Sequence, residues 1–236
     1  MPTIFRQMFD AASSTYTYLI ADGGEAILID PVFEQVRRDG ALIEELGLSL
    51  IATLETHVHA DHVTGAARLR EATGCRIAFP EAAAVEGADV QLRDGQWLEA
   101  GDLRLQALAT PGHTAESFCY YQPAAGRLFT GDTLLIDGCG RTDFQNGDSA
   151  ALYRSVRETL FALPDETLVY PGHDYQGRRV SSIGQEKARN PRLGGERTAE
   201  EFAAIMAALD LPRPKKIDEA VPANRRCGAP QATLSA

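Results

Sequence analysis

The chain has 236 residues, of which 44% are hydrophobic and 24% are charged, a balance typical of a globular protein with a buried core. Its formal net charge of −10 disfavours a nucleic-acid partner, because binding to a phosphate backbone needs clustered lysine and arginine. No apolar stretch approaches the roughly 18 residues of a membrane span, and no secretory leader pattern is visible. We therefore expect a cytoplasmic protein without a membrane segment.

Hydrophobic periodicity predicts strands and helices that alternate along the chain. In the first half the predicted elements are strands over 4–9, 16–20 and 26–30, a helix over 34–46, a strand over 48–54, a helix over 63–73, and strands over 75–79, 103–108, 118–121 and 127–130. The second half adds a helix over 148–161, a strand over 167–170, a last helix that begins at Thr198, and an irregular packed tail from Leu211. This order predicts an α/β protein, with two sheets between helices in one domain over residues 1–236.

The four cysteines form no C-x-x-C pair. In a chain of this size without a secretory signal, free thiols are expected rather than disulfides. Cys75 and Cys119 fall among apolar residues and are expected in the core, whereas Cys139 and Cys227 lie in segments rich in glycine and arginine.

Three of the five histidines lie within one short run, Thr56-His57-Val58-His59-Ala60-Asp61-His62. His57 and His59 are two residues apart, so an extended backbone directs both imidazoles to the same side. Asp61 and His62 follow where a helix is predicted to begin, and can turn back toward the same pocket. Imidazole and carboxylate groups are good ligands for zinc, iron or manganese, so this run predicts a metal site.

The other two histidines occupy nearly identical settings. His113 and His173 each follow a predicted strand and a Pro-Gly pair, and Asp132 also comes directly after a predicted strand. Several strand ends along one edge of a sheet can converge on one point. A lone histidine is most often a surface or hydrogen-bonded core residue, but five in such settings indicate metal ligands.

The order H-x-H-x-D-H followed by a distant His, Asp and His resembles the metallo-β-lactamase superfamily. The resemblance implies an αββα sandwich with the metal site at one edge of two mixed sheets. In two-metal members the first metal is bound by the positions that match His57, His59 and His113, the second by those that match Asp61, His62 and His173, and Asp132 bridges them. All seven positions are present, so the pattern allows one metal or two.

Further motifs are similar to one family within this superfamily, the persulfide dioxygenases. They are Gly138-Cys139-Gly140-Arg141-Thr142-Asp143-Phe144-Gln145, Pro171-Gly172-His173-Asp174-Tyr175, Asn190-Pro191-Arg192-Leu193 and Val221-Pro222-Ala223-Asn224-Arg225-Arg226-Cys227-Gly228. The matches cover nearly the whole chain. The resemblance implies that metal ligands lie at strand ends within 57–173 and that residues from about 184 to 236 form a substrate-side segment.

By this resemblance the chain oxidises the sulfane sulfur of glutathione persulfide with O₂, giving sulfite and glutathione in sulfide detoxification. One Fe(II) per chain would be held by His57, His113 and Asp132, which leaves open positions for substrate and O₂. The remaining positions, His59, Asp61, His62 and His173, would orient these ligands or hold a second metal. A homodimer is also implied.

Glutathione carries two carboxylates, which guanidinium groups bind well. The expected substrate-binding residues are Arg141, Tyr175, Arg192, Arg225, Arg226 and Cys227. For each arginine a structural ion pair is the alternative role, and for Cys227 a buried structural role.

Three other functions are compatible with parts of the pattern. The intact seven-ligand set suits a glyoxalase II-like hydroxyacylglutathione thioester hydrolase, in which two metals activate a bridging hydroxide. A nuclease of the superfamily is disfavoured by the acidic charge. A non-catalytic scaffold or sensor would not need every metal position, so retention of all seven favours an enzyme.

Overall fold

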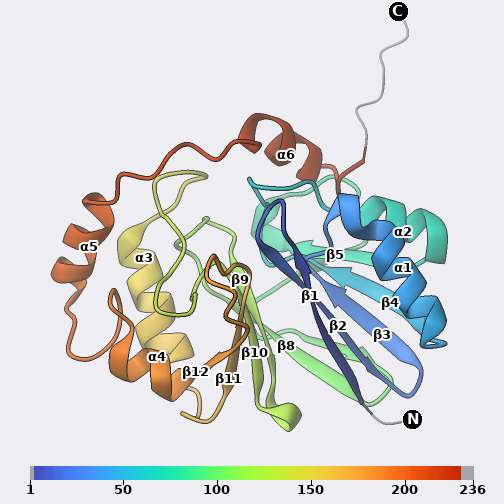
Figure 1. Ribbon diagram of the computed structural model, residues 1–236, viewed down its shortest axis with the longest axis horizontal. Coiled ribbons are helices and arrows are strands. Elements are labelled where there is room, and N and C mark those ends of the chain that lie inside the picture. Colours follow the sequence, from blue (N-terminus) through green and yellow to red (C-terminus); the bar gives the residue numbers. More distant parts are fainter. Residues whose placement is uncertain (1–2, 230–236) are drawn as a thin grey trace, which may run out of the picture.

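Two mixed β-sheets pack face to face at the centre of the computed structural model, which describes residues 3–229 (Figure 1). The first sheet has the order β1 (Ile4–Asp10), β2 (Thr15–Asp22), β3 (Glu25–Ile29), β4 (Ser49–Leu54), β5 (Arg76–Pro80) and β6 (Val90–Leu92). β1, β2 and β3 pair in antiparallel fashion, whereas β3 to β6 pair in parallel. The parallel strands therefore deliver their carboxyl ends to one edge of the sheet.

The second sheet also has six strands but is mostly antiparallel. Its order is β12 (Ser181–Ser182), β11 (Leu168–Pro171), β10 (Arg127–Gly131), β9 (Phe118–Gln122), β8 (Leu103–Ala109) and β7 (Trp97–Ala100). Only β10 and β11 pair in parallel. These two strands are the ones that lead to Asp132 and His173.

The side chains of β2 alternate between the two faces of the first sheet. Tyr18 and Ile20 point into the core between the sheets, whereas Leu19 and Ala21 point to the helices on the outer face. Successive side chains of a strand face opposite sides, so a strand buried on both faces is apolar throughout.

Helices cover both outer faces of the sandwich (Figure 1). The first sheet is covered by α1 (Val36–Glu45) and α2 (Ala66–Thr73), and the second by α3 (Ser149–Arg154), the π-helical turn η4 (Ser155–Leu160), α4 (Ile183–Arg189) and α5 (Ala199–Ala207). Short 3₁₀ turns are η1 (Phe33–Gln35), η2 (Glu81–Ala83) and η3 (Pro123–Ala125). The chain then crosses the top of the molecule to α6 (Ile217–Asn224). The predicted αββα sandwich is confirmed.

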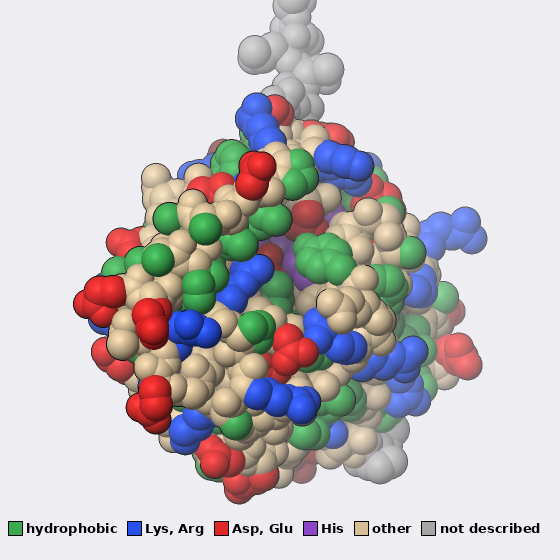
Figure 2. All heavy atoms as spheres, turned by 60° about the vertical axis from the view of Figure 1, so that its left-hand side comes forward, with side chains coloured by type: hydrophobic (Ala, Val, Ile, Leu, Met, Phe, Trp, Pro, Cys, Tyr) green, Lys and Arg blue, Asp and Glu red, His purple; other side chains and the backbone are tan. Residues whose placement is uncertain are grey.

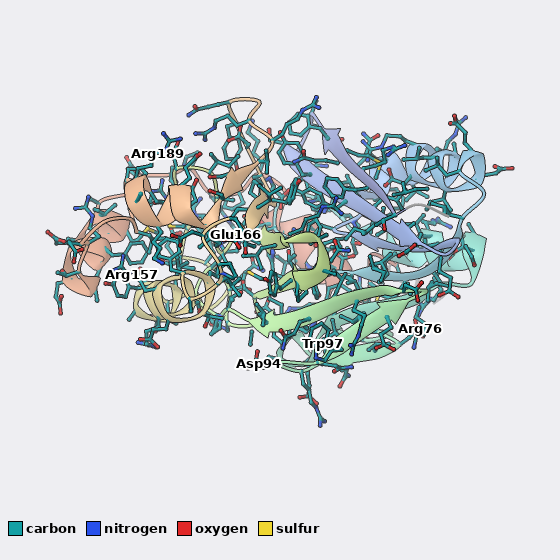
Figure 3. The ribbon with its side chains drawn as sticks, turned by 90° about the horizontal axis from the view of Figure 1, so that it is seen from below. Arg76, Asp94, Trp97, Arg157, Glu166 and Arg189 are labelled. Atoms are coloured by element: carbon teal, nitrogen blue, oxygen red, sulfur yellow. The ribbon has the colours of Figure 1, made fainter. Side chains whose placement is uncertain are left out.

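The view from below separates the two outer layers (Figure 3). Arg157 and Arg189 lie at the left, beside the helices of the second sheet, whereas Trp97 of β7 and Asp94 of the turn before it lie at the bottom of the picture. No helix within residues 3–229 is long and apolar enough to cross a membrane.

Most predicted elements are present, and the differences have local causes. Helix α2 begins at Ala66 rather than Val63, because residues 57–65 form a loop around the candidate site. Asp148 caps α3 and Thr198 forms a capping box at α5, as predicted. The irregular tail from Leu211 was a wrong prediction, since α6 forms there with Pro222 inside it. Strands β6, β7 and β12 and helix α4 were not predicted.

Candidate metal centre

The predicted ligands meet where the strands of both sheets end. His57 follows β4, His113 follows β8 and Asp132 directly follows β10, and one donor atom from each lies within 4.8 Å of the others. His173 follows β11, with its Nε2 3.6 Å from Asp132 Oδ1. Figure 2 shows histidine side chains at the bottom of a hollow that hydrophobic and basic side chains border.

A second group of donors lies beside the first. His59, Asp61 and His62 also place one donor atom each within 4.8 Å of one another. The ring centroids of His59 and His62 are 4.3 Å apart, and those of His57 and His59 are 4.1 Å apart. The run of histidines therefore faces one buried pocket, as the spacing predicts.

Each histidine uses one ring nitrogen to hold its orientation. His113 Nδ1 donates to the carbonyl of Arg141 at 2.7 Å, and His173 Nδ1 donates to the carbonyl of Ser14 at 3.1 Å. His62 Nδ1 donates to Asp61 at 2.8 Å. The opposite nitrogen of each ring is left for a ligand, which is how protein partners fix a metal-binding imidazole.

Asp30 organises the other two histidines from the end of β3. Its carboxylate accepts hydrogen bonds from the Thr56 amide at 2.7 Å, the Thr56 hydroxyl at 2.9 Å and His59 Nε2 at 3.1 Å. Because the Thr56 hydroxyl donates to Asp30, it accepts from His57 Nδ1 at 3.0 Å. His57 thus presents Nε2 to the pocket, and His59 presents Nδ1. Sequence reasoning missed Asp30, although it directly follows a buried strand as Asp132 does.

Unpaired buried atoms show that this pocket fits a cation. His59 Nδ1, His62 Nε2 and Asp132 Oδ1 are buried and have no hydrogen-bond partner within residues 3–229. Such atoms are costly to bury unless a ligand satisfies them. A nitrogen and carboxylate donor set of this kind suits a transition metal. Backbone also crowds the site, since a Cβ at Gly172 would lie 2.7 Å from Asp132 Oδ1.

The electrostatics of the pocket also favours a bound cation. Burial and the neighbouring His59 and His113 hold the pKa of His57 well below its usual range, so the ring stays neutral and able to bind a metal. Burial lowers the pKa of His59, but Asp30, Glu55 and Asp61 outweigh it and raise that pKa well above its usual value. Without a metal, these carboxylates draw a proton onto His59, and a cation would take its place.

Tyr175 stands at the rim of the pocket. Its ring stacks on His173 with centroids 6.0 Å apart and planes 4° apart, and 76% of the residue is exposed. The turn that carries it is held by Asp174, which accepts from the backbone of Gln176 and pairs with the Arg178 guanidinium at 2.8 Å. Tyr175 thus lies exposed beside His173, and substrate binding by it stays a prediction.

Two of the predicted substrate-binding arginines are engaged within the protein. Arg141 pairs with both carboxylate oxygens of Asp143 at 2.6 and 2.7 Å and donates to the carbonyls of Leu211 and Pro212. Arg192 donates to the carbonyl of Cys139 at 2.9 Å. The structural role that was the alternative for each is therefore present, and substrate binding by either stays a prediction.

The structure does not bring the three C-terminal candidates to the histidines. Arg225 is exposed, and Arg226 lines a separate cavity of about 540 Å³ between η1, α2 and α6. Cys227 is buried in an apolar cluster with Val58 and Ala66. The expectation of free thiols is confirmed, since all four cysteines are free and buried.

Residues 11–173 match the family model described as the metallo-beta-lactamase superfamily, and the fold and the strand-end site described above agree with it. The chain therefore belongs to this superfamily. A metal cofactor is part of that assignment, because the histidine and aspartate cluster of the superfamily pattern is complete.

Three comparisons place the chain more narrowly. It is 47% identical over 230 residues to "Persulfide dioxygenase ETHE1, mitochondrial" of Homo sapiens, covering 96% of this chain and 89% of that protein. The crystal structure of ETHE1 from Myxococcus xanthus has a TM-score of 0.93 and 55% identity, covering 96% of this chain and all of that chain. Hydroxyacylglutathione hydrolase of Brucella ovis is 37% identical over 171 residues, 72% of this chain and 65% of that protein. Within the superfamily, the chain belongs to the persulfide dioxygenase family.

Proposed function

We propose that this protein is a glutathione persulfide dioxygenase. Glutathione persulfide, O₂ and water give glutathione, sulfite and protons, with both atoms of O₂ transferred to the terminal sulfur. The observation that carries the proposal is the similarity to persulfide dioxygenases over nearly the full chain, together with the convergence of His57, His113 and Asp132.

Two imidazoles and one carboxylate would hold a single Fe(II) in this site. Iron bound there supplies the electron transfer that O₂ chemistry needs. The chain's own part is orientation: the Arg141 carbonyl fixes His113, and Asp30 fixes His57 through the Thr56 hydroxyl. The buried pocket excludes bulk water from the reacting sulfur.

His59, Asp61, His62 and His173 would orient these three ligands through charge and packing, since His59 packs on His57 and His173 Nε2 lies 3.6 Å from Asp132 Oδ1. Asp61 accepts from His62 and lies 3.7 Å from His173 Nε2. The burial of Asp61 opposes ionisation, yet His62 and His173 hold its pKa well below the usual value, so it stays a carboxylate. Tyr175 would form one wall of the substrate channel, because it lies at the rim beside His173.

One observation favours a second function. One donor atom each of His59, Asp61 and His62 lies within 4.8 Å of the others, as is also the case for the proposed iron ligands. A two-metal site would suit a thioester hydrolase of the hydroxyacylglutathione type.

Metal analysis combined with O₂ uptake distinguishes the two functions. We expect one iron per chain and O₂ consumption that depends on glutathione persulfide, with sulfite as product. Two zinc ions per chain, no O₂ uptake and cleavage of S-lactoylglutathione would instead establish the hydrolase. The proposal also includes a single domain. It includes a homodimer as well, and sedimentation of the full chain tests that oligomeric state.

A further inference from the structure

We propose that Asn224, the last residue of α6, is a positioning residue for the metal-binding loop, defined as residues 57–62. Its side-chain Nδ2 donates to the carbonyl of His59 at 2.9 Å and to the carbonyl of His62 at 2.9 Å. Its Oδ1 accepts from the Thr64 amide at 2.8 Å. The inference concerns the metal centre of the proposed function and holds whichever metal occupies it.

The hydrogen bonds of Asn224 use both donors of its amide and one acceptor. The residue is fully buried, so these bonds are made away from water. Only asparagine and glutamine carry a side-chain amide with two N–H donors and a carbonyl acceptor, and glutamine is longer by one methylene group. Asparagine is therefore required by the geometry, and a substitution leaves buried backbone groups of the loop unpaired.

Neighbouring contacts make the attachment continuous. The carbonyl of Cys227 accepts from the Ala67 amide at 3.1 Å, in the first turn of α2. Gly228, with φ of +75°, packs so closely that a Cβ there would lie 2.2 Å from the Thr64 carbonyl oxygen. Residues 224–228 are thus fixed against both the metal-binding loop and the helix that follows it.

The loop needs such support because it lies between β4 and α2 and belongs to neither. Within residues 3–229, no strand ladder or helix satisfies the carbonyls of His59 and His62. Asn224 binds these two carbonyls and so fixes the backbone from which both imidazoles project. Their unpaired atoms, His59 Nδ1 and His62 Nε2, then stay directed into the pocket beside His57.

The test compares the iron-loaded wild-type chain with Asn224→Asp. The substitution keeps the size and the acceptor but places a carboxylate oxygen against two carbonyl oxygens. We expect Fe(II) release to a chelator to become roughly 10-fold faster, because the loop that Asn224 fixes also carries the ligand His57, and partners that orient ligands typically change metal affinity by 10-fold or more. The visible absorption of the Co(II)-loaded chain should also shift, because it reports ligand geometry.

Phe202→Leu is the matched control, since Phe202 is fully buried in α5 against the second sheet. It should lower the melting temperature without changing Fe(II) release or the Co(II) spectrum. If Asn224→Asp does not fold, Asn224→Ser is measured in the same way.

Release and spectrum equal to wild type would overturn the proposal, and so would changes no larger than those of a control with the same loss of melting temperature. These readouts need no dioxygenase turnover. A chain without persulfide oxidation but with faster metal release on Asn224→Asp would refute the proposed function and keep this inference.

Discussion

The two sheets contribute to the metal centre in different ways. The first sheet supplies four of the seven candidate ligands from one loop of six residues, held by Asp30 and Asn224. The second sheet supplies His113, Asp132 and His173 from three separate strand ends. In the first case one backbone segment determines several ligands at once. In the second case each ligand depends on its own strand, and His113 and His173 each also depend on a backbone carbonyl.

This contrast implies that a substitution disturbs several candidate ligands in the first sheet but one in the second. A change near the 57–62 loop should disturb His57 and His59 together, because Asp30 and Thr56 connect them. A change at a strand end of the second sheet should affect one ligand. The predictions below test this difference, beginning with the largest effect.

Asp132→Ala removes the carboxylate that lies 3.6 Å from both His113 Nε2 and His173 Nε2. Since loss of a partner outside the metal's ligands already costs 10- to 100-fold, loss of a ligand should lower O₂ uptake by more than about 100-fold. Iron content and persulfide-dependent O₂ uptake measure the effect. Activity like that of wild type would remove Asp132 from the proposed ligand set.

Asp30→Asn should loosen two ligands of the first sheet together. It replaces a buried carboxylate that accepts three hydrogen bonds, so we expect the free energy of unfolding to fall by about 2 kcal/mol. Metal affinity should fall by about 10- to 100-fold. Urea unfolding and competition with a chelator check both numbers. Unchanged metal affinity would contradict the coupling of His57 and His59 through this residue.

Gly172→Ala tests the second sheet by displacing a single ligand. The new Cβ would lie 2.7 Å from Asp132 Oδ1, so the carboxylate must move, and we expect activity to fall about 10-fold. Gly40→Ala is the control, because a Cβ there meets nothing within 4 Å and lies in α1. The rate of O₂ uptake is measured for both variants. Equal rates would show that the Asp132 carboxylate can shift without loss of activity.

Asp174→Asn should have the smallest effect on the site, because it changes the stability of the fold and its pH dependence rather than a metal ligand. Burial raises the pKa of Asp174, but its bonds with Arg178 and Gln176 outweigh burial and lower that pKa below 3.8. A carboxylate with a lowered pKa stabilises the fold above pH 3.8 and loses this contribution as pH falls further. We expect wild type to exceed the variant by about 2 kcal/mol at pH 7, a difference that shrinks below pH 3.8. Urea unfolding across pH measures it, and a difference independent of pH would refute the ion pair.

The sequence was sufficient for the sandwich and for the residues that converge, because strand periodicity and the histidine spacing are local patterns. Ligands after β4, β8, β10 and β11 could be recognised without coordinates. The supporting residues could not, because their partners are distant in the chain. Asn224 gave no pattern of its own, and its hydrogen bond to His59 joins residues 165 positions apart.

The same distance bears on Arg225, Arg226 and Cys227, which the structure places away from the histidines and for which substrate binding stays a prediction. The motif over 221–228 is predicted to contribute substrate-binding residues. In the structure its residue Asn224 contacts the metal-binding loop, where it bonds to backbone groups. The motif identified a segment that contacts the metal-binding loop, but not which of its side chains does so. That side chain could not be chosen because helix α6 was not predicted.

The contact between Asn224 and the loop also has a consequence for synthesis. A ribosome releases the seven candidate ligands well before it releases α6, so a nascent chain holds every ligand while its metal loop still lacks this support. A metal ion acquired at that stage would exchange readily, and one acquired after the C-terminal segment docks would be retained. Completion of the chain and maturation of the metal centre are thereby linked in time.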